Sequence, residues 1–177
     1  MAVVLSAQRE TLDRILAVVA GQVIMQSDVR AFLELGLMDG VAQTDEAVLT
    51  YLIERRLVLD EVDRYVAANP PPPVVERRLE LVAARFTSEA AFRDALARVG
   101  LTDDDLRQVL RDDARRDAYI ENRFGAAGGA IDREALVAEW VVRLVRRGQV
   151  IRPLDRRGGG HDDQDLGGVE AGVADHR

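Results

Sequence analysis

The residues that could carry out chemistry in this chain are unevenly distributed. Its only two histidines, His161 and His176, lie near the C-terminus, and it contains no cysteine. The lack of cysteine excludes disulfide bonds, thiolate zinc sites and cysteine nucleophiles. Because residues 14–154 contain no histidine, no serine there can form a triad with a histidine base. We therefore predict that the protein is not an enzyme, unless a partner chain supplies the chemistry.

Groups of carboxylates are the remaining candidates for a metal or acid–base site. The run HDDQD at residues 161–165 would bind a metal weakly, because no rigid cage surrounds it, and solvated charge is the simpler interpretation. Asp103–Asp105 stand where a helix is predicted to begin, and there they compensate the positive end of its dipole. Glu54 and Glu61 share one predicted helix face flanked by arginines, which is typical of an exposed surface. We expect no metal site and no cofactor.

The size and charge of the chain limit its partners. With 177 residues, 47% of them apolar, it is long enough to bury a substantial core. Its formal net charge of −7 argues against a nucleic-acid partner, because phosphate binding requires a concentrated basic surface. The sequence also contains no apolar run long enough to span a membrane.

Three regions differ in composition. Residues 1–13 form either a short lead-in or the remnant of a secretory signal peptide, since the small residues "LSA" before Gln8 resemble a cleavage site. Residues 14–154 contain the periodic apolar patterns and are predicted to form one helical domain. Residues 155–177 are acidic, rich in glycine and poor in large apolar groups, which predicts a disordered tail.

The first periodic region predicts a β-hairpin. Arg14–Ala20 and Gln22–Gln26 are rich in valine, isoleucine and leucine and are separated at Gly21. Ser27 follows as a candidate N-cap for a short helix over Asp28–Gly36. An isolated hairpin is only marginally stable in water, so these strands need a further partner.

The rest of the domain predicts helices separated by caps, glycines and prolines. Thr44 is placed to cap a long helix, which the "ANPPPP" run ends because proline is incompatible with a helix interior. A short helix then ends at Gly100, Thr102 caps the next, and a last helix covers about Asp132–Arg147. The apolar stripes of the helix after the prolines and of the last helix are Val75, Leu79, Val82 and Phe86, and Val137, Trp140, Val141 and Leu144.

The helix after Thr102 also carries many charges. Pairs such as Asp103–Arg107 and Asp112–Arg116 are four residues apart, a spacing that brings opposite charges together on a helix surface. We expect these pairs to lie on the solvated face of the helix.

The fold class predicted from these patterns is mainly α. We expect about six helices and a small antiparallel sheet, made of the N-terminal hairpin and a C-terminal strand within Gln149–Leu154. That segment is the one other strand candidate, so Val150–Arg152 should pair with Arg14–Val19 and bring the two ends of the domain together.

The stretch "ILAVVAGQVIMQSDV" resembles the opening of the N-terminal core domain of SurA-type periplasmic chaperones, in which a hairpin leads into the first helix. The positions that carry the resemblance are Ala17, Val18, Val19, Gly21, Val23, Ile24, Ser27 and Asp28. The segments "VLTYLIERRLVLDEVDRYV" and "SEAAFRDALARVGLTDDDLRQVLRDDARRDAYIENRF" are similar to later helices of that family, so the likeness covers about Arg14 to Leu154.

Two departures from the family pattern limit what the resemblance implies. Ala20 stands where the family usually has asparagine, which weakens the turn. The well-known members also carry parvulin-type prolyl isomerase domains after this module, whereas this chain passes directly to the helix that contains Trp140. Prolyl isomerase activity is therefore not expected here.

The resemblance implies a non-catalytic chaperone module that binds unfolded or extended polypeptide. It further implies a periplasmic or exported location and a role in folding cell-envelope proteins, those of the outer membrane in particular. Its apolar cradle would be lined by side chains that ordinary core packing also explains. These candidate peptide-binding residues are Phe32, Leu35, Met38, Tyr65, Phe86 and Phe124.

A second hypothesis belongs to a different class of function. The protein would be a structural or assembly subunit whose apolar face is filled by one specific partner or by a second copy. Exchange of the terminal strand or helix between two chains would give a homodimer.

Overall fold

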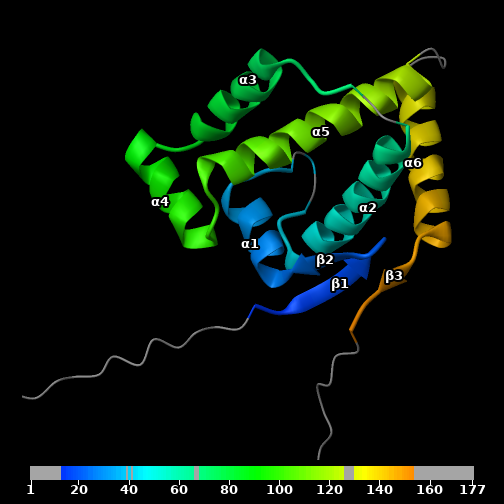
Figure 1. Cartoon of the computed structure of the whole chain (residues 1–177), viewed down its shortest axis with the longest axis horizontal. Coiled ribbons are helices and arrows are strands. Elements are labelled where there is room, and N and C mark those ends of the chain that lie inside the picture. Colours follow the sequence, from blue (N-terminus) through cyan, green and yellow to red (C-terminus); the bar gives the residue numbers. More distant parts are fainter. Residues whose placement is uncertain (1–12, 39, 41, 66–67, 126–129, 154–177) are drawn as a thin grey trace, which may run out of the picture.

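Helices form most of the protein, and a small sheet lies at one end of them (Figure 1). The computed structural model describes residues 13–38, 40, 42–65, 68–125 and 130–153, so the predicted tail at 155–177 and most of the lead-in lie outside the described residues. In this part of the chain the elements are, in order, β1 (Ile15–Val19), β2 (Gln22–Met25), α1 (Gln26–Glu34), α2 (Asp45–Arg64), α3 (Pro72–Ala83), α4 (Glu89–Val99), α5 (Asp103–Phe124), α6 (Ala130–Arg147) and β3 (Val150–Ile151). The predicted fold class, mainly α with about six helices and a small antiparallel sheet, is confirmed.

The hairpin turns at Ala20 and Gly21. Both residues have a positive φ, of 49° and 77° respectively. This is the geometry of a tight hairpin turn that matches the twist of its strands. Glycine adopts it freely, whereas the Cβ of alanine makes it unfavourable. The Ala20 N–H donates to the carbonyl of Gln149 at 3.2 Å, so the other end of the domain holds the strained residue in place.

The third strand joins the two ends of the domain. β1 is the central strand, and both β2 and β3 pair with it in antiparallel fashion. Val18 lies opposite Ile151, and Val19 lies opposite Val150. The predicted pairing of the C-terminal strand with the first strand is therefore confirmed.

The start of α1 corrects one prediction. The helix begins at Gln26, so Ser27 lies inside its first turn and is not the N-cap. The cap position falls to Met25, whose backbone N–H donates to the Asp28 carboxylate at 2.7 Å. The Ser27 hydroxyl donates to Asp13 instead. The reason is that β2 continues into α1 without a connecting loop, so the last residue of the strand takes the cap position.

The helices α2 and α5 begin at their predicted caps, Thr44 and Thr102, and Ser88 caps α4. The hydroxyl oxygens of Thr44 and Ser88 accept from backbone N–H groups in the first turns of α2 and α4. At α5 the bonds are reciprocal: Thr102 Oγ1 accepts from the Asp105 N–H at 3.2 Å, and the Asp105 carboxylate accepts from the Thr102 N–H at 2.9 Å. Hydrogen bonds from the Thr102 hydroxyl and N–H lower the pKa of Asp105.

We expect Thr102→Ala to lower the free energy of unfolding by about 1 kcal/mol, because the first turn of α5 then loses its side-chain acceptor. Urea unfolding followed by circular dichroism measures the change. Thr102→Ser keeps the hydroxyl and should retain most of the stability. An equal loss in both variants would contradict the capping explanation, because it would assign the effect to the methyl group.

Two apolar clusters make up the core. One joins the sheet with α1, α2 and α6, and includes Phe32, Met38 and Trp140. The other joins α1 with α3, α4 and α5, and includes Leu35 and Leu106. Figure 1 shows α3 and α4 on one side of the molecule and α6 on the other, with the long α5 extending between them. None of the described helices is both long enough and apolar enough to cross a membrane.

Candidate binding cleft

An open cleft lies where the two apolar clusters meet. It has a volume of about 510 Å³, and the end of α1 together with α2, α3 and α5 forms its walls. Its apolar lining consists of Leu37, Leu81, Val82 and Leu110, and its polar lining includes Tyr51, Arg78, Arg85, Asp113, Arg116 and Asp117. The cleft is therefore amphipathic, with aliphatic groups and ion pairs in one depression.

A buried ion pair lies beneath the polar side of the cleft. Arg55 of α2 donates through Nε to the carboxylate of Asp113 on α5 at 2.7 Å, and through Nη2 to the carbonyl of Val109 at 3.0 Å. Both charged side chains are largely shielded from solvent. The Arg55 guanidinium also lies over the ring of Phe32, 5.6 Å from its centroid, a favourable cation–π arrangement. These contacts fix α2 against α5.

Arg116 extends this network to the surface of the cleft. Its Nη1 donates to the Tyr51 hydroxyl at 2.7 Å, and it forms ion pairs with Asp113 at 3.5 Å and Asp117 at 3.0 Å. Burial by itself lowers the pKa of Arg116, but the nearby Tyr51 and Asp113 raise it by more, so the guanidinium stays charged. The expected pairing of Arg116 with Asp112 on a solvated face is replaced by these contacts, because this side of α5 faces α2.

A further ion pair ties α3 to the same network. Arg78 donates to Asp117 at 2.8 Å across the space between α3 and α5. Arg55, Arg78 and Arg116 thus share two aspartates, and Arg85 adds a further arginine to the lining, so the polar side of the cleft carries a net positive charge. It can offer hydrogen bonds to the carbonyl groups of a bound chain, since arginine side chains only donate.

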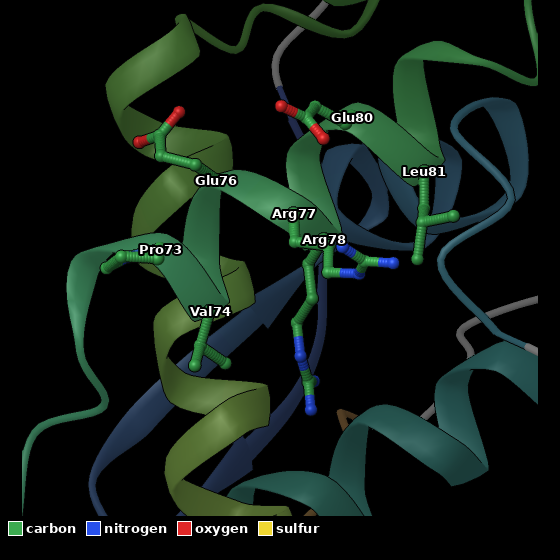
Figure 2. A pocket seen from close by; sticks show the side chains of 7 residues that line it. All are labelled: Pro73, Val74, Glu76, Arg77, Arg78, Glu80 and Leu81. Atoms are coloured by element: carbon green, nitrogen blue, oxygen red, sulfur yellow. The ribbon is translucent and has the colours of Figure 1, made fainter.

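The apolar rim of the cleft is exposed at Leu81 of α3. This side chain is 62% exposed, and it lines both the cleft and a second depression of about 580 Å³ along α3. Figure 2 shows Val74, Arg78 and Leu81 projecting on one side of α3 and Glu76 on the other. Val74 is also exposed. Arginines lie between these two apolar side chains, so the depression along α3 is amphipathic, like the cleft.

The six candidate peptide-binding residues lie elsewhere. Phe32, Leu35 and Met38 are buried in the core, where they pack between α1 and its neighbours. Tyr65 is 63% exposed at the end of α2, with its ring 5.8 Å from that of Tyr119. None of these four lines the cleft.

The last two candidates are half-buried in ring pairs. Phe86 packs against Phe92 with ring centroids 5.5 Å apart, and Phe124 packs against Trp140 at the same separation. Neither lines the cleft. The six residues therefore do not line one common depression in the described part of the chain. A binding role for them stays a prediction.

Sequence reasoning missed the ion pair beneath the cleft and the residues that line it, although a signal for the ion pair existed. On α2, Arg55 continues the apolar spacing of Leu52 and Leu59, and on α5 Asp113 lies three residues after Leu110 on the buried face. Opposite charges at core positions of two helices predict a buried pair, because a lone buried charge is strongly unfavourable.

The described residues contain no group of three or more metal-ligating side chains. Glu54 and Glu61 of α2 are half-buried, not fully exposed as expected, and their surroundings differ: burial raises the pKa of Glu54, whereas Glu61 accepts a hydrogen bond from Arg64 at 3.1 Å. Comparisons of the chain with protein-family models, curated proteins and solved structures find no match.

Proposed function

We propose that the protein is a non-catalytic, chaperone-like module that binds extended segments of unfolded polypeptide in the cleft between α3, α5 and α2. The observation that carries the proposal is the exposed Leu81 at the rim of an amphipathic depression. Open apolar surfaces that continue into a cleft are characteristic of binding sites for peptides and ligands.

The dimensions and chemistry of the cleft suit a short stretch of chain. Its volume of about 510 Å³ is within the range of ligand pockets and is large enough for a few side chains. Aliphatic burial contributes about 25 cal/mol per Å², from which the cost of ordering the client is subtracted. Because apolar burial has no preferred direction, we expect selectivity to be low and binding to be weak and tolerant of sequence.

The resemblance of the chain to SurA-type chaperones supports a particular class of client. Under this proposal the clients are unfolded cell-envelope proteins, including those of the outer membrane, and the protein works in the periplasm or as an exported protein. Prolyl isomerase activity is not part of the proposal.

Leu81→Glu tests the cleft directly. We expect this variant to bind a fluorescently labelled, unfolded outer-membrane protein segment at least about tenfold more weakly, because burial of a leucine side chain contributes about 1.5–3 kcal/mol. Fluorescence anisotropy measures the affinity, and light scattering measures how well the variant suppresses client aggregation. Since Leu81 is exposed, the variant should retain the wild-type unfolding transition.

Leu136→Glu is the matched control. Leu136 is an exposed leucine on α6, on the opposite side of the molecule from α3 (Figure 1). Equal loss of binding in both variants, or in neither, would contradict the placement of the client in the cleft. If wild-type protein in several-fold excess leaves client aggregation unchanged, the chaperone proposal itself fails.

A further inference from the structure

The outward side of α6 carries a second apolar stripe. Val137, Trp140, Val141 and Leu144 face the core and are buried or half-buried. A separate set, Ala135, Ala138, Val142 and Val145, follows spacings of three, four and three residues and is exposed. Val142 is 47% exposed and Val145 is 37% exposed. The spacing of this set is that of a seam between two paired helices.

The position of α6 leaves this stripe open to a partner. The helix stands at the outer edge of the molecule, with its inner side against α2 and α5 (Figure 1). A helix with apolar residues on both sides is usually covered on both sides. We call the set Ala135, Ala138, Val142 and Val145 the outer stripe.

We propose that the outer stripe pairs with the outer stripe of a second copy of this chain, with the two α6 helices antiparallel about a twofold axis near Glu139. A twofold interface uses the same patch on both copies, so the patch must be complementary to itself. Two independent features of α6 meet this requirement.

The first feature is side-chain size. In the antiparallel pair, Ala135 of one copy lies opposite Val145 of the other, and Ala138 lies opposite Val142. Each small residue therefore faces a β-branched one, which allows the two surfaces to interdigitate at close distance. A parallel pair would place alanine against alanine and valine against valine, leaving a gap at one end.

The second feature is the distribution of charge. Asp132, Glu139 and Arg146 recur at seven-residue intervals along one edge of the outer stripe. In the antiparallel pair, Asp132 of one copy lies beside Arg146 of the other, and this contact occurs twice. Glu139 lies near its own copy at the axis, where its ion pair with Arg143 offsets the repulsion. In a parallel pair the same edges of the two copies lie on opposite sides of the seam, so the contact between Asp132 and Arg146 is lost and Glu139 lies beside Glu134 of the other copy, which is unfavourable.

Exchange of strands between chains is not needed for this dimer. In the described residues β3 pairs with β1 of its own chain, and α6 packs on its own α2. The pairing also leaves α3 uncovered, because α3 lies away from α6 (Figure 1), and no residue of α6 lines the cleft. Two copies would thus present two open clefts.

The oligomeric state of the full chain tests the proposal. We expect sedimentation equilibrium over a concentration series to show a rise from the 19.5 kDa monomer to twice that mass. Val142→Glu should raise the dissociation constant of the dimer at least tenfold, whereas Leu136→Glu, which lies off the outer stripe, should leave it within about twofold. A monomer at every concentration, or a dimer that Val142→Glu does not weaken, would overturn the proposal.

Disulfide cross-linking through introduced cysteines tests whether the two helices are antiparallel, since the natural chain has no cysteine. In the antiparallel pair the two copies of residue 135 are about 15 Å apart, because ten residues of helix rise by that length, and this exceeds the reach of a disulfide. We expect Ala135→Cys alone to give no cross-link under oxidation, and Ala135→Cys combined with Val145→Cys to give a covalent dimer. A cross-link in the single variant would overturn the antiparallel arrangement.

The proposal of a dimer through α6 and the proposal of client binding in the cleft can be contradicted independently of each other. Val142→Glu should bind an unfolded client segment with wild-type affinity per chain, and Leu81→Glu should keep the wild-type dimerisation constant. Loss of both properties in either variant would show that the two surfaces are not separate, and would contradict the placement of the dimer interface on α6.

Discussion

Asp113→Ala is expected to lower the free energy of unfolding by about 3–5 kcal/mol. Removal of one partner from a buried ion pair leaves the other charge without compensation in a poorly solvated site. Here the charge left without its partner is that of Arg55, whose Nε lies 2.7 Å from the Asp113 carboxylate. Arg116 loses a contact at the same time. Both arginines belong to the network that joins α2 to α5, so the substitution should also loosen the contacts between these helices at the floor of the cleft.

Urea unfolding at neutral pH measures this loss. Asp113→Asn keeps a hydrogen-bond acceptor of the same shape but not the charge, and should be destabilised by less than the alanine variant. Glu89→Ala removes one partner of an exposed pair with Arg93, and should change stability by less than about 1 kcal/mol. A loss in Asp113→Ala no larger than that in Glu89→Ala would contradict the burial argument.

Trp140→Ala is expected to destabilise the protein by about 3–5 kcal/mol, the usual effect of removing a large aromatic side chain from a core. Trp140 is buried, and its ring lies 6.0 Å from Tyr119 and 5.5 Å from Phe124. The guanidinium of Arg123 lies over the same ring at 5.5 Å. These contacts hold α6, and hence β3, against the rest of the domain.

Hydrogen exchange tests which part of the protein responds to this change. In Trp140→Ala the amides of α6 and β3 should lose protection before those of α4, which belongs to the other apolar cluster. Trp140→Phe retains most of the ring contacts and should recover more than half of the lost stability. Uniform loss of protection across all helices would contradict the local role of Trp140.

The parts of the fold that local patterns encode were predictable from the sequence. Thr44 and Thr102 mark helix starts, and the β-branched runs around Gly21 mark the hairpin, because each signal acts within a few residues. Ser27 was assigned wrongly because a serine before an acidic residue resembles a cap even where a strand continues into a helix.

The cleft was not predictable in the same way. Asp112 and Asp113 are adjacent and chemically identical, yet Asp113 is buried against Arg55 and Asp112 is half-exposed. What separates them is the rotation of α5 against α2, which depends on contacts between residues far apart in the chain. Leu81 lies outside the apolar stripe predicted for this helix, so its outward position agrees with the spacing, but only the packing of α3 against α5 shows that a cleft lies beside it.

The pairing of β1 with β3 has a consequence for synthesis of the protein. Val19 and Val150 are about 130 residues apart, so the ribosome makes nearly the whole domain before β1 can acquire its second neighbour. At about 5–20 residues per second this interval lasts from several seconds to about half a minute. Throughout it, one edge of β1 offers unpaired backbone groups to any extended chain nearby. The nascent chain is therefore most open to wrong pairing at its very first strand.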